Sequence, residues 1–328
     1  MRWLIHELNL EVDNIRPHVK VIDNFLKKHE SKIKDLRFMA HLFRKSLLSM
    51  IGLILILILI IVALFAPFIA SQHPSYVRVS TEQGTTVTEE RWDIDFSQSL
   101  LPPSTDYFFG TDDYGRDIFS MVVYGSQTSF RICIIVVAIS MLIGLLLGGI
   151  AGYFGGIIDE ILMRITDVFL AVPYLILAMA VAAALGRSID HIMEAMIIVW
   201  WPTYARLIRG QVLAVREQQF VEAARSIGAG NSRILFRHIF PNSFAPLLVE
   251  ITLDLGAVLL VAAGLSFIGL GASPGTAEWG LMISSGRIHM LHAWWYVTFP
   301  GLAILLVVLG FNLLGDGLRD VTDPKLRR

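Results

Sequence analysis

The chain has 328 residues, of which 55% are hydrophobic, and a mean hydropathy of +0.62. Soluble domains are about 45–50% apolar, and the excess here lies in long blocks, which excludes an ordinary soluble globular protein. The net charge of -1 says little, because the placement of charge matters more in a membrane protein, and the single Cys133 excludes an intrachain disulfide.

The apolar blocks predict an all-α membrane protein with six transmembrane helices, because a spanning helix needs about 20 mostly apolar residues. Residues 46–77 contain no Asp, Glu, Lys or Arg. The fourth block is the weakest, since it is short and contains Asp190 and Glu194. A cleaved signal peptide is not expected, because the polar segment before the first block is too long. The predicted spans are Leu47–Ile69, Ile132–Phe154, Val168–Leu185, Ile189–Trp201, Phe244–Leu265 and Trp294–Leu314.

Lys and Arg are concentrated in alternate segments, and this asymmetry predicts the orientation. Residues 1–45 hold ten of them and residues 202–243 hold six, whereas residues 70–129 hold three. With the N-terminus inside, the inner segments carry 21 Lys and Arg residues and the outer segments carry five. We therefore expect a multi-pass protein of the cell (plasma or inner) membrane with both termini in the cytoplasm.

Residues 220–242, FVEAARSIGAGNSRILFRHIFPN, are a charged segment between two apolar blocks. On a helix, Phe220, Ala223, Ala224 and Ile227 share one face at the 3–4–7 spacing. This face indicates either an amphipathic helix on the inner leaflet or an element that docks into a groove of a soluble partner. The residues alone leave both interpretations open.

The same segment predicts a helix–turn–helix. Gly228 and Gly230 fit the end of the first helix, where a left-handed backbone favours glycine. Ser232 is a candidate N-cap for a second short helix. Pro241 is expected to end that second helix.

The sequence contains no G-x-x-x-x-G-K-[ST] phosphate-binding loop, so the chain is not expected to be an ATPase. Its histidines and its cysteine lack metal-ligand spacing. Asp112, Asp113 and Asp117 form an acidic cluster on the predicted outer side. We interpret this cluster as a solvated turn at Gly115, because calcium needs more oxygen ligands at a different spacing.

Glu250 and Asp254 are four residues apart in the fifth predicted span and therefore share a helix face. Acids within a membrane are costly and usually face the bundle interior or a watery cavity. They could contact substrate or a partner subunit, couple transport to protons, or be solvated at the membrane surface. Solvation is favoured for Glu250 and Glu194, whereas Asp254 is as compatible with lining an interface or cavity as with solvation.

The first 40 residues repeat apolar positions in alternating steps of four and three, which is a heptad pattern broken near Pro17. This extension is expected to lie on the membrane surface through its Lys and Arg, or to pack on a partner subunit. The polar outer segment TEQGTTVTEE, residues 81–90, is either a contact for a binding protein or a solvated insertion.

Several motifs together resemble one family. Glu222–Ala224, followed by Gly228 and a late proline, resembles the EAA motif of ABC importer permeases, although His238 and Phe240 depart from it. The resemblance covers about residues 40–328 and is to the C-type permease subunit of dipeptide/oligopeptide/nickel importers. The other matching segments are FGTDDYGRDIFS (109–120), GYFGGIIDEILMRITDVFLAVP (152–173), YARLIRGQVLAVREQQFVEAA (204–224), GLSFIGLGA (264–272), EWG (278–280) and FNLLGDGLRDVTDPKLR (311–327).

The resemblance implies a type I ABC importer permease fold in which the EAA helix is a coupling helix that sits in a cleft of an ATPase. It also implies a non-catalytic subunit with no cofactor of its own, since ATP and Mg are bound by the partner ATPases. The implied coupling residues are Phe220, Glu222, Ala223, Ala224, Ile227 and Gly228.

The implied partners are a second homologous permease in a heterodimer, two cytoplasmic ABC ATPase subunits, an extracytoplasmic substrate-binding protein and membrane lipid, but no nucleic acid. The implied substrates are di- and oligopeptides, with nickel or oligosaccharides as alternatives. The rival functions are an ion-driven secondary transporter that uses Asp254 or Glu250, and a non-transporting scaffold or receptor.

These considerations divide the chain into five parts. The predicted parts are a cytoplasmic N-terminal extension (1–45), a first transmembrane helix (46–72), an extracytoplasmic loop (73–129), a five-helix core (130–315) with its coupling loop (202–243), and a cytoplasmic tail (316–328).

Overall fold

The computed structural model describes residues 41–80, 86–273 and 275–322; most of the predicted N-terminal extension lies outside them. Four helices in this part of the chain are long and apolar enough to span a membrane. The elements are α2 (Leu47–Leu64), α3 (Ala66–Ile69), β1 (Ser75–Ser80), β2 (Thr86–Arg91), η1 (Phe96–Gln98), α4 (Ile118–Phe154), α5 (Gly156–Leu170), α6 (Tyr174–Leu185), α7 (Ile189–Arg216), α8 (Gln219–Ser226), α9 (Asn231–Ile234), η2 (Leu235–Ile239), α10 (Phe240–Ile268), α11 (Trp279–Gly286), η3 (Arg287–His289) and α12 (Trp295–Thr322).

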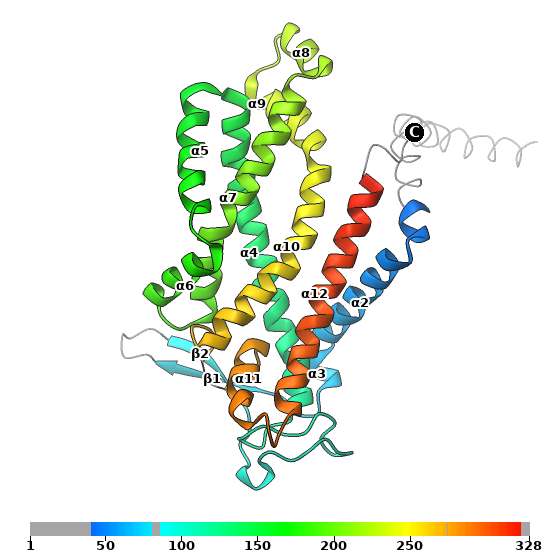
Figure 1. Cartoon of the computed structure of the whole chain (residues 1–328), viewed down its shortest axis with the longest axis vertical. Coiled ribbons are helices and arrows are strands. Elements are labelled where there is room, and N and C mark those ends of the chain that lie inside the picture. The colour runs from blue at the N-terminus through cyan, green and yellow to red at the C-terminus, as the bar shows by residue number, and fades with distance from the viewer. Residues whose placement is uncertain (1–40, 81–85, 274, 323–328) are drawn as a thin grey trace, which may run out of the picture.

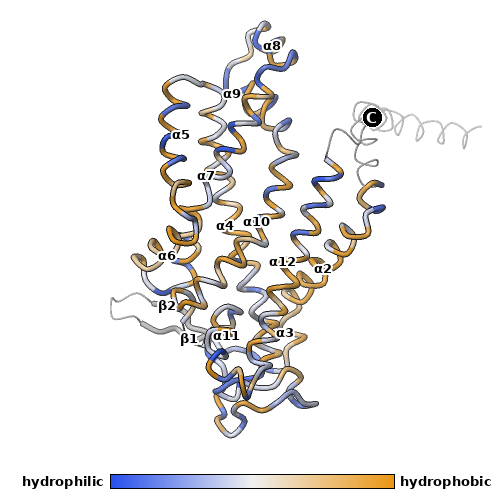
Figure 2. Tube along the Cα trace, in the orientation of Figure 1, coloured by the Kyte–Doolittle hydropathy of each residue, from blue (hydrophilic) through white to orange (hydrophobic). Residues whose placement is uncertain are grey.

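The long helices α4, α7 and α10 run approximately along the long axis of the molecule, whereas α6 lies across it (Figure 1). α8 and α9 lie at one end, while the β1–β2 hairpin, α11 and the loop before α4 lie at the other (Figure 1). Hydrophilic residues are frequent near α8 and in the loop at the opposite end, and apolar residues dominate α2 (Figure 2). Only 22% of α2 is buried within the chain, as expected for a helix that contacts lipid.

The predicted outer loop contains a small sheet that the apolar pattern does not predict. β1 and β2 pair antiparallel, with Ser75 opposite Arg91 and Ser80 opposite Thr86. Thr86–Glu90 of the acidic segment therefore form part of a strand, while residues 81–85 lie outside the described residues. The rest of the described chain is helical or irregular, so the helical fold class is confirmed in kind.

The expectation of a solvated acidic turn is wrong for Asp112 and Asp117, which are both buried. Asp112 accepts hydrogen bonds from the Arg116 Nε (2.6 Å) and from the Tyr114 backbone N–H (2.9 Å). Burial raises the pKa of Asp112, and the adjacent Arg116 guanidinium opposes that shift. Asp117 caps α4 and accepts from the Ser120 hydroxyl at 2.6 Å. These acids hold the loop on α4 because the chain itself satisfies them.

α4 begins 14 residues before the predicted span, at Ile118 instead of Ile132. Its first turns include buried serines, which lower the local hydropathy although the helix continues. Farther along, Gly144, Gly148 and Gly152 lie at four-residue spacing against α7. A Cβ on Gly148 would lie 2.2 Å from the Ala205 carbonyl oxygen, so only glycine permits this backbone contact.

The third predicted span, Val168–Leu185, is not one helix. It begins within α5, crosses a break and ends with α6, and the two helices are bent by 87°. Pro173 lies in the break and lacks the backbone N–H that a continuous helix would use. The bent pair counts as a fifth span, and α7 is a sixth long helix that is not among the candidate spans.

The chain passes from α9 into α10 without the predicted stop at Pro241. A π-helical turn, η2, joins the two helices, and Pro241 occupies the first turn of α10. Pro241 has no backbone N–H to donate, and the irregular hydrogen-bond pattern of the π-helical turn directly before it lets the helix continue. Phe240 packs over Gly149 of α4, where a Cβ would lie 2.6 Å from its ring. That contact gives a physical reason for Phe240, whereas nothing in the structure explains His238.

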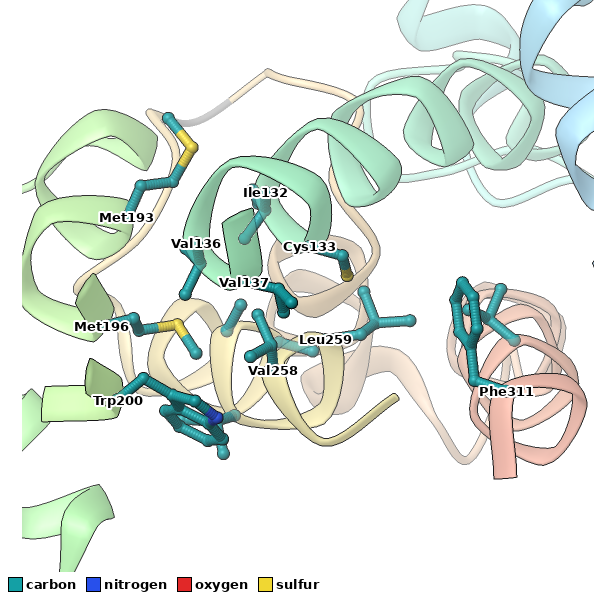
Figure 3. Close-up of a cluster of buried hydrophobic side chains, with 14 of the residues drawn as sticks. Ile132, Cys133, Val136, Val137, Met193, Met196, Trp200, Val258, Leu259 and Phe311 are labelled. Carbon is teal, nitrogen blue, oxygen red and sulfur yellow. The ribbon is translucent and has the colours of Figure 1, made fainter. Parts of the chain in front are cut away.

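The hydrophobic core is formed by the inner faces of α4, α7, α10 and α12 (Figure 3). α4 and α7 make the most extensive contact, and α10 fills the space between α4, α7 and α12. The labelled core residues are Ile132, Cys133, Val136, Val137, Met193, Met196, Trp200, Val258, Leu259 and Phe311 (Figure 3).

Candidate functional site

The segment from Gln218 to Ile234, here called the α8–α9 tip, presents apolar side chains to the outside. Ile227 is 86% exposed and Phe220 is 43% exposed. Glu222 and Ala223 are exposed beside them. These exposed apolar groups at a polar end of the molecule make the tip the candidate interaction surface.

The inward face of α8 includes one residue of the predicted apolar face. Val221 is fully buried and Ala224 is only 6% exposed, so both pack against their own chain. Ala224 therefore supports the helix from inside and does not line the exposed surface with Ala223 and Ile227. The 3–4–7 spacing located the helix, but its predicted apolar face contains buried Ala224 as well as exposed Phe220, Ala223 and Ile227.

Gly228 ends α8 as predicted, with a φ of +83°. Its N–H donates to the Arg225 carbonyl (3.0 Å), and the Ala229 N–H donates to the Ala224 carbonyl (3.1 Å). These two bonds are the Schellman arrangement, which satisfies the last carbonyls of a helix. The N-cap of α9 is Gly230 and not Ser232, so that part of the prediction is wrong.

Three short connections fix the α8–α9 tip to the bundle. Only Glu217 and Gln218 separate α7 from α8. The Arg216 Nη1 donates to the Gly152 carbonyl at the end of α4 (3.0 Å). The Tyr153 hydroxyl of α4 donates to the Asn231 Oδ1 of α9 (2.8 Å). These connections join the tip to α4 and α7.

Two ion pairs join α5 to α7. Arg209 binds Asp159 with two hydrogen bonds, Nε to Oδ1 at 2.5 Å and Nη2 to Oδ2 at 2.6 Å. Arg206 binds Asp167 through one hydrogen bond at 2.6 Å. The first pair is more buried: its Arg209 and Asp159 side chains are 33% and 17% exposed. In the second pair, the Arg206 and Asp167 side chains are 56% and 53% exposed.

Replacing Asp159 by Asn is expected to lower the free energy of unfolding by about 1.5–3 kcal/mol, the range for a hydrogen bond to a charged group. The matched change Asp167→Asn is expected to cost about 1 kcal/mol or less, because that pair is exposed. Denaturant unfolding of the detergent-solubilised protein measures both. Equal decreases in the free energy of unfolding would show that burial and bidentate geometry do not make the Asp159 pair the stronger one.

The two predicted intramembrane acids lie in different surroundings. Asp254 on α10 is 9% exposed, and its Oδ2 has no hydrogen-bond partner in the part of the chain that the structure describes. Glu250, one turn away, is half-buried. Asp254 borders a cavity of about 380 Å³ between α10, α7 and the break between α5 and α6.

The cavity contains residues that the pattern analysis missed. Phe169, Tyr174 and Trp200 line it, and the Tyr174 and Trp200 rings form an edge-to-face pair with centroids 5.5 Å apart. The signal in the sequence was Pro173 in the middle of a predicted span, because a proline there indicates a broken helix.

Comparisons with known proteins agree with this architecture. The family described as "Binding-protein-dependent transport system inner membrane component" matches residues 144–328. The family described as "N-terminal TM domain of oligopeptide transport permease C" matches residues 38–103. Among solved structures, an inward-facing methionine ABC transporter has a TM-score of 0.50 at 20% identity, over 63% of this chain and 98% of that chain.

Curated relatives are similar over most of their length. A protein of Escherichia coli (strain K12), described as a probable D,D-dipeptide transport system permease protein, is 45% identical over 87% of this chain and 90% of its own. A dipeptide transport system permease protein of Alkalihalophilus pseudofirmus is 43% identical over 87% and 88%. An oligopeptide transport system permease protein of Bacillus subtilis is 39% identical over 87% and 88%.

The spanning helices, the bent α5–α6 pair and these matches lead to one conclusion. The chain belongs to the family of binding-protein-dependent transport system inner membrane components, and it is an integral membrane permease subunit of the ABC importer type.

Proposed function

We propose that the chain is the permease subunit of an ATP-driven importer of di- or oligopeptides, and that the α8–α9 tip is its contact with the ATPases. The observation that carries the docking role is the exposure of Ile227 and Phe220 at the end of a rigid helical turn. The peptide substrate is supported by the relatives, which are named as dipeptide and oligopeptide permeases.

The assembly that this function needs has four further subunits. A second, homologous permease completes the pathway in a heterodimer, two cytoplasmic ABC ATPases bind ATP and Mg, and an extracytoplasmic protein delivers the peptide. The chain itself performs no covalent chemistry. The excess of Lys and Arg in residues 1–45 and 202–243 supports a cytoplasmic position for the tip and both termini.

The geometry suggests how motion enters the membrane. An ATPase that moves Ile227 and Phe220 also moves α7 and α10, because the α8–α9 tip is continuous with α7 and, through η2, with α10. The Arg209–Asp159 pair then transmits movement of α7 to α5. When the spacing of these helices changes, the path between this permease and the second permease opens or closes.

Uptake by proteoliposomes that contain the complete complex tests the overall function. Peptide uptake should require ATP and the binding protein, and it should persist in the presence of a protonophore. Uptake that collapses with the proton gradient and ignores ATP would instead identify a secondary transporter.

Cysteine crosslinking tests the docking surface directly. A cysteine at exposed Ala223 is expected to form a crosslink with an ATPase subunit that carries a cysteine in its docking cleft. A cysteine at the adjacent Ala224 is the matched control, and it should not crosslink because that side chain is buried. Electrophoresis without reducing agent detects the product. Crosslinks at Ala224 but not at Ala223 would contradict the proposed surface.

A further inference from the structure

The cavity beside Asp254 combines one carboxylate with several aromatic rings. It has a volume of about 380 Å³, and Phe169, Tyr174 and Trp200 line it together with Asp254. Four different helices, α5, α6, α7 and α10, supply these side chains. An apolar cavity with a few convergent polar groups is the usual form of a site for a small ligand.

The carboxylate of Asp254 has no basic partner among the described residues, and the polar groups that face it are those of Tyr204 and Trp200. Its Oδ2 accepts no hydrogen bond there, and the buried Tyr204 hydroxyl that faces it from α7 is also without a partner. The nearby arginines of α7, Arg206 and Arg209, bind Asp167 and Asp159 instead. A buried carboxylate is costly unless it is paired, and Asp254 is therefore free to bind a cation.

The chemistry of the cavity selects an organic ammonium ion. Aromatic faces attract ammonium groups through their π electrons, and a carboxylate supplies the opposite charge. A calcium or magnesium ion is excluded because it requires about six oxygen ligands. No group of three or more His, Cys, Asp or Glu side chains in the described ranges could hold a metal ion.

The break between α5 and α6 borders this cavity. α5 and α6 are bent by 87°, and Leu170, Val172 and Pro173 at the break line the cavity. Irregular backbone at membrane depth is tolerated only where protein covers it or where it borders a water-filled cavity. Broken helices in transporters commonly adjoin the substrate.

We propose that Asp254, with Phe169, Tyr174 and Trp200, binds the protonated amino terminus of a peptide during its passage. This inference rests on the proposed peptide-importer function and adds a point of recognition within the membrane. The same primary ammonium chemistry occurs in the ethanolamine headgroup of a phospholipid, so the experiment must separate these two sources.

The test uses the full complex in lipid nanodiscs without the binding protein, so that only the membrane subunits select the ligand. Equilibrium binding of radiolabelled dialanine is compared with that of N-acetyl-dialanine. The wild type is expected to prefer the free amine by about tenfold, which corresponds to roughly 1.4 kcal/mol. Asp254→Asn should reduce that preference to near unity, and Asp254→Glu should restore part of it.

Glu194→Gln is the matched control, because it removes an exposed acid from α7 and should leave the preference unchanged. If Asp254→Asn fails to assemble, Thr203→Trp fills the cavity from an exposed position and should lower dialanine binding to a similar extent. Size-exclusion chromatography establishes assembly for each variant.

Two lipid compositions separate the sources of the ammonium group. Dialanine should bind equally in nanodiscs of phosphatidylglycerol alone and in nanodiscs that also contain phosphatidylethanolamine. Suppression of binding by phosphatidylethanolamine would assign the site to the lipid headgroup and overturn the peptide proposal. Equal preference in the wild type and Asp254→Asn, with intact ATP-driven peptide uptake, would overturn the inference alone. Absence of ATP-driven peptide uptake by the wild type would overturn the proposed function as well.

Discussion

Replacing Ile227 by Asp is expected to abolish ATP-driven uptake while leaving the fold of the chain intact. Ile227 is 86% exposed at the end of α8, so the chain loses little packing and its unfolding free energy should change by only about 0.5 kcal/mol. In the assembled complex the same side chain is expected to fill a pocket of the ATPase. Loss of a central apolar anchor costs about 2 kcal/mol or more, which is roughly a thirtyfold loss of affinity.

The measurement combines uptake by proteoliposomes with co-purification of the ATPase subunits. Ser226→Asp is the matched control, because it places the same charge one residue away on the polar side of α8. It should retain most of the uptake. Normal uptake by Ile227→Asp, or equal losses in the two variants, would show that the exposed apolar face is not the coupling surface.

Replacing Gly148 by Ala is expected to destabilise the whole bundle by about 3 kcal/mol, the upper part of the usual range for overpacking. The added Cβ would lie 2.2 Å from the Ala205 carbonyl oxygen, and that neighbour is backbone, which cannot rotate away. α4 and α7 would have to separate along their most extensive contact. Thermal unfolding in detergent measures the loss, and the yield of folded protein should fall with it.

Gly301→Ala in α12 provides the comparison, because no atom lies within 4 Å of the Cβ that it would add. Alanine also favours a helix over glycine by about 1 kcal/mol, so this variant should be as stable as the wild type or more so. A similar loss in both variants would show that helix propensity in the membrane, and not the α4–α7 contact, determines the effect.

Local chemistry predicted some features of the site well. The end of α8 at Gly228 depends on a few neighbouring residues and on the left-handed backbone of glycine, and it is confirmed. Pro241 follows the same local rules, yet the prediction of a helix end was wrong. The choice between stopping a helix and occupying its first turn depends on η2 and on the packing of Phe240 against Gly149, which are tertiary contacts.

Hydropathy predicts contact with lipid and not the extent of a helix. The first 14 residues of α4 were therefore missed, because Ser120, Ser126 and Ser129 face protein and lower the apolar average. The stripe Gly144, Gly148 and Gly152 was visible as small residues at four-residue spacing, which is typical of close helix contacts in membranes. Which helix packs against it was not predictable, since that depends on the arrangement of the bundle.

Periodicity also left the orientation of α8 undetermined. It identified a helix with an apolar face, but a helix at a surface contacts its own chain on one side and a partner on the other. Ala224 proved to face inward, and Ala223 and Ile227 to face outward. The role of the predicted coupling residues in docking stays a prediction until the crosslinking and uptake experiments are done.

The two helices that carry the α8–α9 tip also form walls of the cavity beside Asp254. α7 leads into α8, and α9 continues through η2 into α10. Val199, Trp200 and Thr203 of α7 and Asp254 and Ala257 of α10 line the cavity. Thermodynamic linkage is reciprocal. If movement of the tip changes the affinity of the cavity for peptide, then a bound peptide shifts the position of the tip by the same free energy. A peptide bound in the cavity would thus change the affinity of the tip for the ATPases, and the permease would report the presence of its substrate to them.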